Sequence, residues 1–164
     1  ETCGECHKKA YAKWKSTKHA HAYETLKTGR KGQYSQPISR IHDPECLSCH
    51  VTGWDPQGVV RYDSGFLPEA LAQLQAKPKL FTHLQGQQCE NCHGPGSEHV
   101  AQERLLETNR DQVDKMKLAA ARLKVQLKRD VAEQHLCVKC HDYENSPKFE
   151  FNKYWEEVKH PFRD

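Results

Sequence analysis

The chain has 164 residues, of which 36% are hydrophobic and 29% are charged, and its formal net charge is +3. This length suits a single domain over residues 1–164, and the charge is too small and too evenly mixed to favour nucleic-acid binding. No apolar run approaches the roughly 18 residues of a membrane-spanning helix, so no membrane insertion is expected. Eight cysteines and eleven histidines are unusually many. They predict a fold organised by something other than aliphatic side chains.

The predicted elements of the N-terminal half are one helix followed by irregular chain. A helix is expected over about residues 5–28, ending at two nearby glycines. Residues 30–66 contain scattered Gly and Pro, so mostly loop is expected there, with one weak strand signal over 57–62. A short helix with proline at its first position is expected over 68–76.

The C-terminal half is predicted to be largely helical. Ser97 suits the N-cap of a helix that continues over about 98–134, with a break near Thr108. Met116 lies on an apolar stripe with helical spacing, so it is expected to pack rather than to bind a metal. A final short helix is expected over about 150–160. The predicted fold class is therefore mainly α with extensive irregular loops.

All eight cysteines fall in four copies of one pattern, Cys-x-x-Cys-His. The copies begin at positions 3, 46, 89 and 137, and no cysteine is left over. The pattern is the c-type haem attachment signal, because two thiols at this spacing reach the vinyl groups of a porphyrin and the next histidine lies beneath the iron. Zinc sites and disulfide frameworks also use paired cysteines, but neither requires a histidine directly after the second cysteine.

The motifs predict four covalently attached haem c groups. The predicted attachment residues are Cys3, Cys6, Cys46, Cys49, Cys89, Cys92, Cys137 and Cys140. The predicted proximal iron ligands are His7, His50, His93 and His141. Four large macrocycles would also replace the missing aliphatic core, which predicts a multihaem cytochrome c fold organised around four haems.

Seven further histidines are available as second axial ligands, and only one methionine competes with them. They are His19, His21, His42, His83, His99, His135 and His160. Imidazole is a good ligand for haem iron, so about half of the seven are expected to be distal ligands and the rest ordinary surface or core histidines. Bis-histidine ligation gives lower potentials than histidine–methionine ligation, which predicts a low-potential carrier.

Longer stretches around the four motifs carry a family resemblance. They are the segment from Cys3 to Leu26, Cys46-x-x-Cys-His-Val-x-Gly, Cys89-Glu-x-Cys-His-Gly-Pro-Gly, and Cys137-x-x-Cys-His-x-x-Tyr-Glu-x-Ser-Pro. On these residues the chain resembles the cytochrome c-554 family, periplasmic tetrahaem carriers that accept electrons from hydroxylamine oxidoreductase. The Cys-His-Gly-Pro-Gly element also recurs in larger multihaem enzymes. The resemblance implies an array of closely packed haems.

The resemblance also implies distal ligands. His99 matches the family's ligand of the first haem, His19 that of the third and His160 that of the fourth. The second haem of the family's type member is five-coordinate, but here His83 stands six residues before Cys89, where that member has no histidine. His83 is therefore the predicted sixth ligand of the second haem. Any of the other three unassigned histidines, or an open position, is the alternative.

Three functions follow from these expectations. A six-coordinate second haem predicts a carrier between redox partners, which the resemblance implies are a hydroxylamine oxidoreductase-like enzyme and a membrane or soluble cytochrome. An open second haem would instead allow reduction of nitric oxide or hydroxylamine. Some small tetrahaem cytochromes form homo-oligomeric extracellular filaments, in which a spare histidine such as His21 or His135 binds a haem of the next subunit.

The expected location follows from the attachment chemistry. Haem is attached covalently outside the cytoplasmic membrane in prokaryotes, so the chain is expected to be periplasmic or extracellular. It begins at Glu1 without a signal peptide, which predicts a processed start. The formal charge omits eight haem propionates, so it predicts no partner charge.

Overall fold

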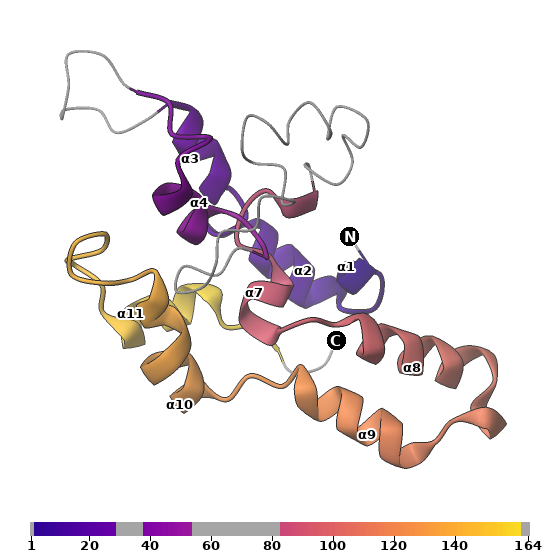
Figure 1. Cartoon of the computed structure of the whole chain (residues 1–164). Coiled ribbons are helices and arrows are strands. Elements are labelled where there is room, and N and C mark those ends of the chain that lie inside the picture. Colours follow the sequence, from indigo (N-terminus) through magenta and orange to yellow (C-terminus); the bar gives the residue numbers. More distant parts are fainter. Residues whose placement is uncertain (1, 29–37, 54–82, 162–164) are drawn as a thin grey trace, which may run out of the picture.

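The computed structural model describes residues 2–28, 38–53 and 83–161, which are helical or irregular (Figure 1). Its α-helices are α1 (Thr2–Cys6), α2 (Lys8–Lys15), α3 (Ala22–Thr28), α4 (Pro44–His50), α7 (Cys89–His93), α8 (Ser97–Thr108), α9 (Lys115–Lys124), α10 (Arg129–Val131) and α11 (Phe151–Val158). Short turns of other helical types are η2 (Arg110–Gln112), η3 (Ala132–Leu136) and η4 (Cys137–Lys139). The β pairing among the described residues is one isolated antiparallel bridge, Val51 with Gln85. The prediction of a mainly α fold is confirmed for these residues.

Each Cys-x-x-Cys-His motif folds as a helical turn. In the first and fourth motifs, the backbone N–H of the histidine donates to the carbonyl of the first cysteine at 2.9 Å. The second and third motifs end α4 and α7 at His50 and His93. Residues three apart share one face of a helix, so the two sulfurs of each motif are placed on the same side.

Two predictions for the N-terminal half are wrong. The expected continuous helix over 5–28 is split into α2 and α3, because the hydroxyls of Ser16 and Thr17 donate to carbonyls of the preceding turn at 2.7 Å each. Residues 44–50, expected to be loop, form α4. Asp43 stabilises its start by accepting a hydrogen bond from a first-turn N–H at 3.1 Å.

The predictions for the remaining helices have mixed outcomes. Ser97 is the first residue of α8, and Gly96 occupies the N-cap position predicted for it. The predicted break near Thr108 is confirmed, because α8 ends there, and the predicted last helix is confirmed as α11. The strand signal over 57–62 and the helix expected over 68–76 lie outside the described residues.

Helices α8 and α9 lie side by side as a hairpin (Figure 1). Asp114 begins α9 by accepting hydrogen bonds from the N–H groups of Met116 at 2.9 Å and Lys117 at 3.2 Å. Leu118 and Ala121 are the buried residues of α9, whereas Met116 is 83% exposed. The prediction that Met116 packs is therefore wrong, because the buried face of α9 is the one that carries Leu118 and Ala121.

The buried apolar core is small. In its main cluster, Tyr23 and Leu26 of α3 pack with Leu47 of α4 and with Val51. A cluster of this size stabilises the α3–α4 region but is little for a chain of this length, which agrees with the predicted need for large prosthetic groups. No helix in the described segments has both the length and the apolar character needed to cross a membrane.

Candidate haem sites

Three pairs of imidazole rings form between residues far apart in the sequence. Each pair joins a motif histidine to a histidine that was predicted as a distal ligand. The ring centroids lie 6.2 Å apart for His7 and His99, 6.0 Å apart for His19 and His141, and 5.7 Å apart for His93 and His160. Three of the four motifs therefore have a second imidazole close to their own.

These separations fit a metal ion held between two axial imidazoles. A metal–nitrogen bond is about 2.0 Å and a ring centroid lies about 1.1 Å behind its nitrogen, so two imidazoles on one ion have centroids about 6 Å apart. Direct ring stacking is closer, as for His141 and Phe149, whose centroids are 4.3 Å apart with an interplanar angle of 12°. The three histidine pairs thus suit bis-histidine ligation of iron.

Contacts at Nδ1 orient three of the four motif histidines. The contacts join His50 to the carbonyl of Ala22 at 2.7 Å, His93 to the carbonyl of Val125 at 2.8 Å, and His141 to the hydroxyl of Ser146 at 3.0 Å. An imidazole that donates through Nδ1 presents an unprotonated Nε2, which is the form that binds a metal.

Burial favours the same protonation state in three of the paired histidines. Desolvation lowers the pKa values of His19, His93 and His141 below the usual range for histidine. Neutral imidazole is also the form that binds iron, so burial and ligation act in the same direction at these residues.

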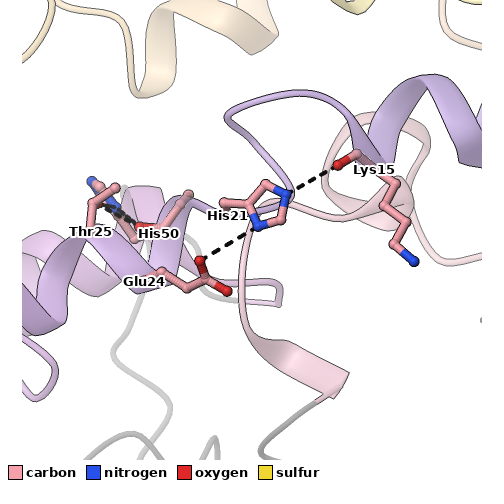
Figure 2. Close-up of polar contacts among 6 residues, drawn as sticks. Lys15, His21, Glu24, Thr25 and His50 are labelled. Atoms are coloured by element: carbon pink, nitrogen blue, oxygen red, sulfur yellow. Dashed lines mark hydrogen bonds and ion pairs between the residues drawn. The ribbon is translucent and has the colours of Figure 1, made fainter.

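The second motif differs from the other three. All eleven histidines belong to the described part of the chain, and within it no other imidazole pairs with His50. Figure 2 shows His50 beside Thr25, whose hydroxyl lies 3.2 Å from its Nδ1. His83 is exposed, and the structure does not bring it together with His50. Its role as the sixth ligand stays a prediction.

Two histidines lie beside other motifs than the family resemblance implies. His19, implied for the third haem, lies beside His141 of the fourth motif, and His160 lies beside His93 of the third. Helix α11 explains the second placement. His141 stacks on Phe149 just before α11, whose 8 residues span about 12 Å and carry His160 away from that motif.

Cysteine sulfurs of different motifs lie against one another. A hydrogen bond with Cys89 lowers the pKa of the Cys3 thiol to about 6, and a hydrogen bond with Cys140 lowers the pKa of the Cys49 thiol to about 6. In the haem-attached protein these sulfurs are thioethers without a proton, so their contacts report position rather than ionisation. They place the first motif against the third and the second against the fourth.

The third and fourth motifs interact electrostatically through Cys92 and Cys137. Burial, together with the smaller effect of the charge of Cys137, raises the pKa of Cys92 to about 11. Together with the two hydrogen bonds between cysteines, this interaction links the four motifs in the order first, third, fourth, second.

Three further histidines, His21, His42 and His135, were candidates for the second haem or for a bridging role. Nε2 of His21 donates to the carbonyl of Lys15 at 3.1 Å, and its Nδ1 lies 3.6 Å from Glu24 (Figure 2). Both ring nitrogens are engaged, which argues against His21 as a ligand for a neighbouring subunit. His135 is exposed on η3, and His42 is half-buried just before α4.

Sequence reasoning missed the groups that orient the motif histidines. Two of them, at Ala22 and Val125, are backbone carbonyls, which no side-chain pattern marks. The third is Ser146, and its signal was its place in the Tyr-Glu-x-Ser-Pro stretch directly after the fourth motif.

Comparisons with known proteins agree with this arrangement. A sequence model of the family described as "Cytochrome c554 and c-prime" matches residues 2–94. The curated cytochrome c-554 of Nitrosomonas europaea is 29% identical over 171 residues, which cover 98% of this chain and 61% of that protein. This chain therefore spans less than two thirds of that relative. The solved structure of reduced cytochrome c554 from the same organism has a TM-score of 0.56 and 24% identity, covering 96% of this chain and 80% of that one.

The matches confirm the predicted multihaem cytochrome fold. They also agree with the cofactor prediction, since the four motifs account for four covalently attached haem c groups.

Proposed function

The chain belongs to the cytochrome c554 and c-prime family, and we propose that it carries electrons between redox proteins by means of four haem c groups. The observation that carries this proposal is the set of three motif histidines that each face a second imidazole at 5.7–6.2 Å. An iron held by both imidazoles of such a pair would have no free position for a substrate, so these sites suit electron transfer rather than chemistry on a bound molecule.

The proposed ligands follow from the ring pairs. His7 and His99 serve the first haem, His93 and His160 the third, and His141 and His19 the fourth. Haem iron with two imidazoles supplies one-electron redox chemistry at low potential. The chain contributes position, because α8, the end of α11 and the turn after α2 each present one distal imidazole.

The sulfur contacts support one array rather than four separate sites. Hydrogen bonds join Cys3 to Cys89 and Cys49 to Cys140, and an electrostatic interaction between Cys92 and Cys137 links these two pairs into one series. Groups attached to adjoining cysteines are held close together, so we propose that residues 1–164 form one tetrahaem domain.

A second candidate function is reduction of a small nitrogen compound at the second haem. The observation that favours it is that no described imidazole pairs with His50, so an iron bound by His50 could take an external ligand. The choice between this function and a pure carrier depends on whether His83 or another group fills that position.

The proposed setting is the periplasm or the cell exterior, with separate redox proteins as donor and acceptor. The family resemblance points to a hydroxylamine oxidoreductase-like donor and a membrane or soluble cytochrome as acceptor. A filament remains the third candidate, with the exposed His135 as its bridging ligand. Size-exclusion chromatography of the purified holoprotein separates these states, since a discrete monomer or dimer peak contradicts a filament.

The proposed function is tested by haem counting and by one ligand variant. The pyridine haemochrome assay should give about four haems per chain, and two or fewer would contradict the proposal. His99→Ala should convert one low-spin haem to high spin in the EPR spectrum of the oxidised protein. His21→Ala is the matched control, because its ring is bound to Lys15 and Glu24 and should leave the spectrum unchanged.

A further inference from the structure

One buried polar atom in the proposed iron sites lacks a hydrogen-bond partner. It is Nδ1 of His99, on α8, and it is the one such side-chain atom within the described segments. The side chain is 19% exposed, and Oε1 of Glu103, one helical turn further along α8, lies 3.7 Å from this nitrogen. A buried donor without a partner is costly, and the carboxylate is an acceptor within reach.

Arg122 of α9 holds the Glu103 carboxylate in place. Nε of Arg122 lies 2.5 Å from Oε1 and Nη2 lies 2.8 Å from Oε2, which is a two-point contact between the helices. A two-point contact with a guanidinium favours the ionised form of the carboxylate. The charged group beside His99 is therefore fixed in position by the α8–α9 hairpin.

Three other imidazoles of the proposed iron sites have neutral groups at Nδ1. These groups are the carbonyl of Val125 for His93, the carbonyl of Pro161 at 3.1 Å for His160, and the hydroxyl of Ser146 for His141. A carboxylate attracts the Nδ1 proton more strongly than a carbonyl or a hydroxyl, and this makes Nε2 a stronger electron donor. A stronger donor stabilises ferric over ferrous iron and lowers the potential.

We propose that Glu103 is a positioning residue that orients and polarises His99, and that Glu103 and Arg122 together set the potential of the first haem. This role rests on the proposed binding of that haem by His7 and His99. With Nε2 of His99 toward the iron, its Nδ1 proton faces Glu103. Arg122 moderates the effect, because it draws on the same carboxylate oxygen.

Substituting the two partners of the Glu103–Arg122 ion pair should shift the potential of the first haem in opposite directions. Glu103→Gln removes the negative charge beside His99, so the potential of the first haem rises. Arg122→Gln leaves the carboxylate free to act on His99 alone, so the potential falls. If the ion pair served only to hold α8 against α9, both variants would break the same contact and shift the potential in the same direction.

The experiment uses the holoprotein and its EPR-monitored redox titration. The low-spin signal of the first haem is the one lost in His99→Ala. At a fixed potential near the midpoint, the ferric-to-ferrous ratio of this haem should fall roughly three- to tenfold in Glu103→Gln, and tenfold corresponds to about 59 mV for one electron. Arg122→Gln should change the ratio in the opposite direction. Shifts of the same sign, or none, would overturn the proposal.

A matched control is available on the same hairpin. Glu98 pairs with Lys124 at 2.6 Å and also joins α8 to α9, whereas the carboxylate that lies near Nδ1 of His99 is that of Glu103. Glu98→Gln should leave the potential of the first haem unchanged. If His99→Ala removes no low-spin signal, the proposed ligation fails. If it does remove one and the Glu103 and Arg122 variants behave like Glu98→Gln, only the role of Glu103 fails.

Discussion

The first and second haem motifs place their histidines in different surroundings. Beside His7 lies His99, carried on a helix that two ion pairs tie to α9. Beside His50 lie groups of α3, the carbonyl of Ala22 and the hydroxyl of Thr25, and both of them face Nδ1. The same five-residue signal thus gives the same attachment chemistry in both motifs, while distant parts of the chain decide what stands opposite the histidine.

The difference also concerns how each region is stabilised. The second motif lies in the best-packed apolar part of the molecule, where Leu47 and Val51 are fully buried. The α8–α9 hairpin buries little beyond Leu118 and Ala121 and is joined by charged side chains. Ion pairs at the surface contribute little stability by themselves. We therefore infer that ligation by His99 itself helps to fix the hairpin, whereas α3 and α4 are held by their own packing.

The prediction with the largest expected effect concerns whether the iron of the second haem lacks a sixth ligand from the protein. If no side chain fills the position opposite His50, the oxidised protein should give a high-spin EPR signal from one haem in four, which an added small ligand such as imidazole converts to low spin. His83→Ala should then leave the spectrum unchanged, and so should the control His135→Ala. A fully low-spin wild type that becomes high-spin in His83→Ala would instead establish His83 as the sixth ligand and remove the contrast between the two motifs.

The next prediction concerns Gly86, which lies just before the third motif and packs against the second motif. Gly86 has φ +80°, and a Cβ there would lie 2.6 Å from the carbonyl oxygen of Ala20. Its N–H also donates to the carbonyl of His50 at 3.2 Å. Gly86→Ala should therefore lower the free energy of unfolding by about 3 kcal/mol, measured by guanidinium denaturation of the holoprotein.

Gly53 supplies the control for Gly86. It has φ +78°, but a Cβ there would meet nothing within 4 Å. Gly53→Ala should therefore cost only the backbone strain, about 1 kcal/mol. Equal losses in the two variants would show that the contact with Ala20 adds nothing, and that the packing between this segment and the turn after α2 is looser than the structure indicates.

The sequence predicted the attachment residues and the candidate distal ligands, because covalent haem chemistry requires a fixed local pattern. It could not predict which of these histidines lies beside which motif histidine. His19 and His160 lie where the turn after α2 and the length of α11 carry them, and both depend on tertiary packing. The burial of Met116 was mispredicted for a related reason. An apolar stripe marks a helical face but does not say which face the neighbouring helix covers.

The prediction with the smallest expected effect compares the groups beside Nδ1 of two motif histidines. The Ser146 hydroxyl lies at Nδ1 of His141, whereas Nδ1 of His50 has both the Ala22 carbonyl and the Thr25 hydroxyl beside it. Ser146→Ala leaves a half-buried ring nitrogen without its partner, so the free energy of unfolding should fall by about 1 kcal/mol and the potential of the fourth haem should change. Thr25→Val should change neither by a measurable amount, because the carbonyl of Ala22 at 2.7 Å still orients the ring. A larger effect in Thr25→Val than in Ser146→Ala would mean that the α3 hydroxyl, rather than the backbone, fixes the histidine of the second motif.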